Sequence, residues 1–259
     1  MKLISLNAWG GKLFIPLMKF IKDNSKDTDI FCFQEVFKTT SNVKIREGYR
    51  MDLYDEVSEV LINHQGYFSP FLENYLIFSR SEVKEVNFNL SYGLAIFIKK
   101  EIGVASVGNF FVYGNKNSFN PKDLNSIPRI LQYMTFTKKN EKFIVCNLHG
   151  IWSKQGKEDS PSRLKQSRKI NKFLGNQLSE KILCGDFNLG LNTESIKILE
   201  KDMRNLIKEY KIKTTRNKLF PGDEKFADYV FVSNGIKIIN FEVPSINISD
   251  HLPMILEFS

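Results

Sequence analysis

The chain has 259 residues, of which 42% are hydrophobic and 25% are charged. These proportions are typical of a globular protein with a sizeable core, and they exclude a disordered, collagen-like or coiled-coil chain. The apolar stretches are far shorter than the ~20 residues that span a membrane, so we expect no stable membrane insertion. Because residues 3–6 already form a predicted strand, we expect no secretory leader and a cytoplasmic protein.

The three cysteines also indicate a cytoplasmic protein. Cys32, Cys146 and Cys184 each lie in an apolar run and are far apart in the sequence. An odd number in strand-like segments predicts reduced, buried thiols rather than a disulfide framework. A zinc site needs closely spaced Cys or His ligands, and the sequence has none.

The net charge of +8 is unevenly distributed along the chain. Residues 151–225 contain 17 lysines and arginines against 10 aspartates and glutamates. The most basic stretch, 201–218, has seven basic residues against two acidic ones: Lys201, Arg204, Lys208, Lys211, Lys213, Arg216 and Lys218. A basic face attracts polyanions such as nucleic acids, although a solvated lysine-rich surface explains the excess equally well.

In chain order, short apolar strands alternate with amphipathic helices. We expect helices at 13–26, 52–63, 162–178, 193–202 and 203–210, and strands at 3–6, 30–36, 75–79, 93–98, 131–137, 143–148, 181–185, 229–232, 236–241 and 253–258. Residues 108–128 have the least regular pattern, and His64 is predicted to cap a helix or lie in a loop. Several strands have the composition of strands buried on both faces, which predicts packed sheets with helices outside. No linker or repeat divides the chain, so we expect one domain, 1–259.

Five of the predicted apolar strands end abruptly in polar residues. The polar groups are Asn7, Gln34-Glu35, His149, Asp186 with Asn188, and Asp250-His251. Polar groups at the edge of an apolar core cost free energy unless they are paired or bind a ligand. Oxygen donors from Asn, Glu and Asp, with no Cys and little His, suit Mg²⁺ or Mn²⁺. The sequence therefore predicts an active site where these strand ends meet.

Six short motifs follow one another in a definite order: Leu6-Asn7-Ala8-Trp9, Gln34-Glu35, Asn147-Leu148-His149, Gly185-Asp186-Phe187-Asn188, Asp228-Tyr229 and Ser249-Asp250-His251. In this order the chain resembles the endonuclease/exonuclease/phosphatase superfamily, which includes pancreatic-type deoxyribonucleases, abasic-site endonucleases, bacterial sphingomyelinases and inositol-polyphosphate 5-phosphatases. The resemblance spans residues 5–252. It implies an α+β fold, a four-layer αββα sandwich of two packed, mainly antiparallel sheets with outer helices, and divalent-metal-dependent hydrolysis of a phosphate ester.

The resemblance assigns the metal to three residues. Asn7 and Glu35 occupy the family's metal-holding positions, and Asp250 reaches the ion or a water bound to it. The ion, Mg²⁺ with Mn²⁺ as the alternative, neutralises charge on the phosphoryl oxygens. Taken alone, Asn7 also fits a turn residue at a strand end, whereas a carboxylate at Glu35, after an apolar strand, has little structural explanation.

The resemblance assigns catalysis to five further residues. His251 accepts the proton of the attacking water or lies beside the phosphoryl group, and Asp228 fixes its tautomer. Asp186 and Asn188 flank a phenylalanine, so on extended backbone they face one side, where the family orients the nucleophilic water and contacts the transition-state phosphate. His149 belongs to the Asn-x-His element that binds the scissile phosphate or assists the leaving group.

The sequence leaves the substrate open. A nuclease acting on DNA or RNA is favoured by the basic stretch, with Arg129, Arg216 and Trp152 as candidate contacts to phosphates and unpaired bases. Exposed arginines and a loop-anchoring tryptophan are the alternatives for these three residues. A phosphatase or phosphodiesterase acting on a lipid or small phosphate ester is the second hypothesis, and a basic patch remote from the site favours it. A non-catalytic nucleic-acid-binding module is the third. We expect a monomer.

Overall fold

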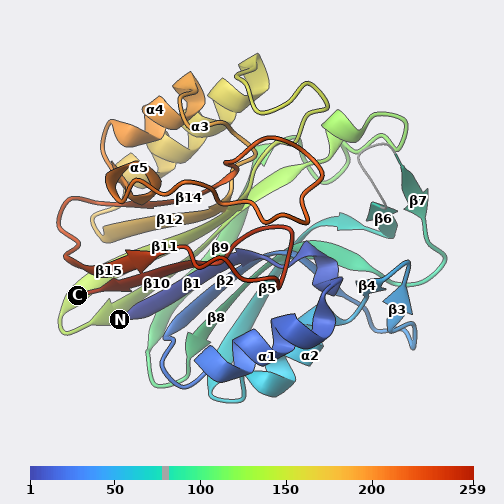
Figure 1. Ribbon diagram of the computed structural model, residues 1–259, viewed down its shortest axis with the longest axis horizontal. Coiled ribbons are helices and arrows are strands. Elements are labelled where there is room, and N and C mark those ends of the chain that lie inside the picture. The colour runs from blue at the N-terminus through green and yellow to red at the C-terminus, as the bar shows by residue number, and fades with distance from the viewer. Residues whose placement is uncertain (78–81) are drawn as a thin grey trace.

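Two six-stranded sheets pack face to face in the computed structural model, which describes residues 1–77 and 82–259 (Figure 1). The strand order of the first sheet is β15 (Ile238–Glu242), β16 (Met254–Phe258), β1 (Lys2–Asn7), β2 (Ile30–Lys38), β8 (Ser91–Lys99) and β5 (His64–Glu73). That of the second is β13 (Arg204–Asn205), β14 (Asp228–Val232), β12 (Glu180–Asp186), β11 (Glu141–His149), β10 (Arg129–Lys138) and β9 (Val104–Tyr113). The pairs β1–β2 and β11–β12 are parallel, and all other neighbours are antiparallel.

Helices cover the outer face of each sheet, which confirms the predicted four-layer αββα sandwich. On the first sheet lie α1 (Phe14–Asn24) and α2 (Leu53–Val60), and on the second lie α3 (Pro161–Gly175), α4 (Glu194–Glu200) and α5 (Leu206–Glu209) (Figure 1). Two hairpins, β3 (Ile45–Arg46) with β4 (Tyr49–Arg50) and β6 (Tyr75–Ile77) with β7 (Val83–Glu85), and 3-10 turns at Trp9–Gly11 and Leu124–Ser126 complete the described elements. The single domain stays a prediction.

The space between the sheets is mainly apolar, but it contains a polar network. Cys32, Cys146 and Cys184 are buried there as free thiols, as predicted. Gln34 donates from Nε2 to Asn147 Oδ1 at 2.7 Å, and Asn147 donates from Nδ2 to the Phe33 carbonyl at 3.0 Å. Since Gln34 comes from the first sheet and Asn147 from the second, this network fixes how the two sheets meet immediately below the predicted site.

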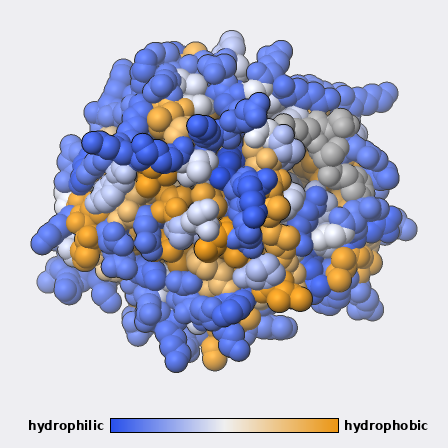
Figure 2. Space-filling model, in the orientation of Figure 1, coloured by the Kyte–Doolittle hydropathy of each residue, from blue (hydrophilic) through white to orange (hydrophobic). Residues whose placement is uncertain are grey.

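On the face shown in Figure 2, the rim is largely hydrophilic and hydrophobic residues gather in the middle. The described residues form no helix that is long and apolar enough to cross a membrane.

Three details differ from the sequence-based expectations. The strands β5 and β9 were not expected, and His64 begins β5 instead of capping a helix; it is buried and donates from Nε2 to the Thr28 carbonyl at 2.8 Å. The helix expected at 203–210 is divided into β13 and α5, because Asn205 caps the N-terminus of α5 by accepting from the Ile207 amide. The strand expected at 75–79 is described only as β6, since residues 78 and 79 lie outside the described residues.

Candidate active site

The polar strand ends meet at one edge of the sandwich. Asn7 is in register with Gln34 across β1 and β2, and His149 is in register with Asp186 across β11 and β12. A cavity of about 720 Å³ opens at this edge. Nine of the eleven residues predicted for the site line it: Glu35, Arg129, His149, Trp152, Asp186, Asn188, Arg216, Asp250 and His251. The other two, Asn7 and Asp228, lie immediately behind them in hydrogen-bonding contact.

A β-bulge in β2 directs Glu35 toward the cavity. The register with β8 shifts between Phe33 and Val36, and Glu35 itself has a φ of 56°, which is uncommon for a residue with a side chain. The bulge lets two consecutive side chains, Gln34 and Glu35, both face the opposite sheet. Backbone strain of this kind persists where the surrounding structure imposes it, and it is common at functional sites.

Gly185 is required where β12 ends. Its φ is 131°, and an added Cβ would lie 2.1 Å from the Leu148 carbonyl oxygen. Because β11 approaches this closely, the next residue, Asp186, accepts the Asn188 amide at 2.8 Å. This hydrogen bond closes a turn in which Asn188 has a φ of 55°. Both side chains face the cavity, as predicted, while Phe187 is buried in the core.

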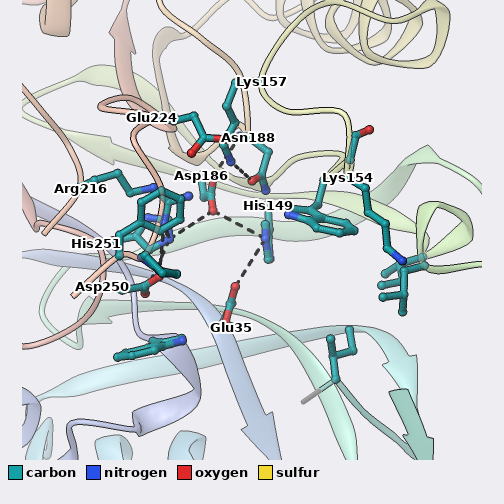
Figure 3. Close-up of a pocket in the computed structure, with 18 of the residues that line it drawn as sticks. Glu35, His149, Lys154, Lys157, Asp186, Asn188, Arg216, Glu224, Asp250 and His251 are labelled. Carbon is teal, nitrogen blue, oxygen red and sulfur yellow. Dashed lines mark hydrogen bonds and ion pairs between the residues drawn. The ribbon is translucent and has the colours of Figure 1, made fainter. Parts of the chain in front are cut away.

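Asp186 lies at the centre of the site (Figure 3). Its Oδ2 faces nitrogen atoms of three residues: Asn7 Nδ2 at 3.2 Å, His251 Nε2 at 3.6 Å and His149 Nε2 at 3.8 Å. Burial disfavours the Asp186 carboxylate, but His251, His149 and the neighbouring cations outweigh burial and hold its pKa below the ordinary value. Asp186 is therefore ionised and can orient a polar group in the cavity.

His251 is held by an aspartate behind it. Its Nδ1 lies 2.8 and 2.9 Å from the two carboxylate oxygens of Asp228. Ser249 fixes the loop that carries this histidine, because its hydroxyl donates to the Asn7 carbonyl at 2.7 Å and accepts the His251 amide at 3.2 Å. Burial and Arg216 oppose protonation of the ring, yet the surrounding carboxylates, led by Asp228, raise the pKa of His251 above its ordinary value.

Arg216 reaches the site from the loop before β14. Its backbone forms an isolated antiparallel β-bridge with that of His251. Its Nη1 lies 3.5 Å from Asp250 Oδ2 and also contacts His251 Nε2. Its guanidinium lies 4.2 Å from the ring centroid of Phe220, another residue of the cavity wall. The expectation of an exposed arginine is wrong for both candidates, since Arg129 and Arg216 are buried.

His149 differs electrostatically from His251. Burial, followed by the charge of Arg129, lowers the pKa of His149 well below its ordinary value, so its ring is neutral. Its Nε2 lies 3.8 Å from Glu35 Oε1. A neutral imidazole at this place can form a hydrogen bond to a phosphoryl or leaving-group oxygen without adding charge.

The carboxylates of the site fit a divalent cation. Burial, followed by the charge of Asp250, raises the pKa of Glu35, so the ionised Glu35 carboxylate favours a positively charged partner. A hard cation with oxygen ligands supplies that partner. Among the described residues, Asp186, Asp228 and His251 also place three ligand atoms within 4.8 Å of one another, but both oxygens of Asp228 already contact His251.

Asn7 is oriented as a donor. Its Nδ2 donates to Glu35 Oε1 at 3.1 Å, and its Oδ1 accepts the Trp9 amide at 3.0 Å. For the Asn7 amide oxygen to bind a metal ion, this side chain would therefore have to rotate.

Lys157 is the principal residue of the site that the sequence did not reveal. It lies in the loop before α3, is 9% exposed, lines the cavity and donates from Nζ to Asn188 Oδ1. Burial lowers the pKa of Lys157 to about 8. The loop has no periodic pattern, and Lys157 is placed by a contact distant in sequence, because its carbonyl accepts the Gly190 amide at 2.8 Å.

Aromatic residues form part of the cavity wall. Trp9 has a φ of 50° at the turn after β1, and Lys12 Nζ lies 4.9 Å from its ring centroid and 4.3 Å from that of Tyr49. Trp152 also lines the cavity and is half-buried. Such rings provide stacking surfaces for the non-phosphate part of a ligand.

The family model described as the Endonuclease/Exonuclease/phosphatase family matches residues 4–251. The chain therefore belongs to this family, whose members are hydrolases that act on phosphate esters, and the resemblance seen in the motifs is confirmed. No curated protein sequence matches the chain significantly.

Solved structures share the fold over the whole chain. A family member from Bacteroides thetaiotaomicron is 18% identical with a TM-score of 0.73, covering 100% of this chain and 94% of that one. A mannosyl-6-phosphatase from the same species is 17% identical with a TM-score of 0.68, covering 100% and 99%. The human Nocturnin catalytic domain, solved with a bound sulfate anion, is 16% identical with a TM-score of 0.69, covering 100% and 94%. At these identities the likeness shows the fold alone.

Proposed function

We propose that this protein is a divalent-metal-dependent phosphoesterase whose substrate is a phosphate ester small enough to enter the cavity. The observation that carries the proposal is the convergence of Asp186, His251 and Glu35 on a cavity of about 720 Å³. A volume of several hundred Å³ is typical of small-molecule sites. It suits a sugar- or nucleotide-sized ester more readily than a continuous duplex.

In the proposed mechanism, His251 accepts a proton from the attacking water at Nε2, and Asp228 stabilises the resulting imidazolium through Nδ1. Asp186 orients the water, and the Asn188 amide together with Lys157 and Arg216 binds the phosphoryl oxygens. Glu35, Asp250 and Asn7 would hold a Mg²⁺ or Mn²⁺ ion, which would supply Lewis-acid neutralisation of the phosphoryl charge. His149 donates a hydrogen bond from its neutral ring to the leaving group.

The position of the basic stretch supports a small substrate over a nucleic acid. Arg204 lies in register with Val232, at the opposite end of β14 from Asp228, and it contacts Glu209. Lys208 is paired with Glu200 at 2.6 Å. Of the seven basic residues in 201–218, Arg216 alone lines the cavity. The charges of Arg204 and Lys208 are therefore paired with glutamates, and six of the seven basic residues do not line the cavity.

Phosphate release from a panel of esters tests the proposal. The panel contains sugar phosphates, nucleotides, inositol phosphates and short-chain lipid phosphates, each incubated with Mg²⁺, Mn²⁺ or EDTA. We expect metal-dependent turnover of at least one soluble small ester, lost in His251→Ala and Asp186→Ala. Turnover of none of these esters, together with cleavage of nucleic acid, contradicts the proposal.

A nuclease is the second candidate, and α3 is the observation that favours it. This helix contains no acidic residue, and its exposed Lys165, Arg168 and Lys172 form no ion pair with any described residue. Supercoiled plasmid and labelled single-stranded DNA and RNA, incubated under the same metal conditions, test this function. Metal-dependent cleavage that both His251→Ala and Asp186→Ala abolish supports a nuclease and separates it from a contaminant.

A further inference from the structure

The buried Arg129 side chain forms no hydrogen bond and no ion pair with the described residues, although the charges of Asp186 and Glu35 act on it from a greater distance. The residue is 4% exposed, lines the cavity, and its Nη1 has no hydrogen-bond partner. Its guanidinium carbon lies 5.5 Å from the ring centroid of Phe71. Burial lowers the pKa of Arg129, so the protein disfavours the charge that this side chain carries.

The other buried arginines show how this fold normally satisfies a guanidinium. Arg163 donates from Nε and Nη2 to the Ile151 carbonyl at 3.2 and 3.1 Å and from Nη1 to the Glu158 carbonyl. Arg216 Nη1 lies against Asp250 and His251, while its buried Nε has no hydrogen-bond partner. An ion buried without a hydrogen-bonded partner is costly, and Arg129 is the arginine of this set that has neither an ion pair nor a hydrogen bond among the described residues.

A second β-bulge places Arg129 at the cavity. Arg129 is in register with Tyr113, whereas the next residue, Ile130, is in register with Phe111, so β9 has one extra residue at this point. Bulges beside active sites redirect side chains in this way. The charge of Arg129 acts on the site directly, because it contributes to the lowered pKa of His149.

We propose that Arg129 binds phosphoryl oxygens of the substrate and that the site consequently prefers a phosphate monoester dianion to a diester. This inference rests on the proposed function and specifies its substrate class. A guanidinium binds phosphate through a planar fork of donors. Asn188, Lys157 and Arg216 already offer donors around Asp186 (Figure 3).

The number of oxygens distinguishes the two substrate classes. A diester has two unesterified phosphoryl oxygens and one negative charge, whereas a monoester has three such oxygens and about −1.5 to −2 charges at neutral pH. The other donors can bind two of the phosphoryl oxygens. Arg129 can then bind the third oxygen of a monoester, with its additional charge, whereas a diester has no third unesterified oxygen.

Two esters with the same leaving group test this preference: p-nitrophenyl phosphate and bis(p-nitrophenyl) phosphate. We expect Arg129→Met to lower kcat/KM for the monoester by about 10- to 100-fold, mainly through KM, as expected for a charge-assisted hydrogen bond. The loss for the diester is expected to stay below about threefold, and Arg129→Lys should recover part of the monoester activity. Arg46→Met, an exposed arginine of β3 that does not line the cavity, is the matched control and should change neither value. Equal losses for both esters overturn the inference.

Binding of inorganic phosphate separates this inference from the proposed function. We expect isothermal titration of the metal-free protein to show phosphate binding that Arg129→Met weakens at least tenfold. If the wild type hydrolyses no ester but binds phosphate through Arg129, the proposed function fails and the assignment of Arg129 stands. If the wild type hydrolyses esters while Arg129→Met changes neither the ester ratio nor phosphate binding, the assignment alone fails.

Thermal unfolding distinguishes a binding role from a structural one. Replacing an unpartnered buried charge by an apolar side chain removes a desolvation penalty. Arg129→Met should therefore melt at or above the wild-type temperature. A large decrease in melting temperature, accompanied by equal losses for both esters, identifies Arg129 as a structural residue and overturns the inference.

Discussion

Both carboxylate oxygens of Asp228 contact His251 Nδ1, at 2.8 and 2.9 Å. The aspartate begins β14 and the histidine lies in the loop before β16, so the pair joins the two sheets. With Nδ1 occupied, Nε2 is left facing Asp186 at 3.6 Å and the cavity. This arrangement fixes the tautomer in which Nε2 carries no proton and acts as an acceptor, here toward Arg216.

The Asp228–His251 contact can be tested by a nearly isosteric change. Asp228→Asn keeps the size of the side chain but removes the charge that stabilises the imidazolium, so we expect kcat to fall by about 10²- to 10⁴-fold. Steady-state kinetics on the best ester of the panel measures this. Asp27→Asn, an exposed aspartate, is the control. A loss below about threefold contradicts the role given to Asp228.

Replacing Glu35 should have opposite effects on thermal stability with and without metal. Burial and Asp250 raise its pKa, so Glu35→Gln relieves repulsion, and the metal-free variant should melt at or above the wild-type temperature. Saturating Mg²⁺ should stabilise the wild type, by about 2.7 kcal/mol at 100 times Kd, and should stabilise Glu35→Gln much less. Thermal melts with Mg²⁺ or EDTA check both effects. An undiminished Mg²⁺ shift in the variant shows that Glu35 does not hold the ion.

Lys157 should set the alkaline limb of the pH profile. Its pKa is lowered to about 8 by burial, so the ammonium that binds phosphoryl oxygens is present below that pH and lost above it. We expect kcat/KM to decrease as the pH rises through about 8. In Lys157→Arg, which stays charged, the decrease should move to a higher pH. An alkaline limb that is identical in the two proteins argues against this role.

The polar network between the sheets should contribute strongly to stability. Asn147 contacts Gln34 and the Phe33 carbonyl, and all of these groups are buried. Asn147→Leu leaves their polar atoms unsatisfied, so we expect a loss of about 3 kcal/mol in the free energy of unfolding. Urea denaturation measures it, with the exposed Thr137→Ala on β10 as control. A loss under about 0.5 kcal/mol contradicts this account of the network.

The site was largely predictable because its residues interrupt apolar strands. Asp186 and His149 each end a buried strand, and their proximity follows from the parallel pairing of β11 with β12. Lys157 gave no such indication, since it lies in an irregular loop and is buried by tertiary contacts alone. The burial of Arg129 likewise depends on a bulge that the sequence does not reveal.

The strands that escaped prediction lie at sheet edges. β5 contains Gly66 and Pro70, which usually interrupt strands, but an edge strand tolerates proline because one side of its backbone is unpaired. β9 is half-exposed and contains Gly108, against which the Tyr133 ring packs, so it lacks a clear alternating pattern. The sequence also does not reveal that two charges of residues 201–218 are paired, because the ion pairs of Arg204 and Lys208 form only in the fold.

The most direct test of the central claim is metal-dependent phosphate release by wild type and His251→Ala, measured side by side on the small-ester panel. The account predicts turnover with Mg²⁺ or Mn²⁺, none with EDTA, and a loss of at least about 100-fold in the variant. Turnover that persists equally in His251→Ala, or no turnover of any small ester by the folded, metal-loaded wild type, would contradict it.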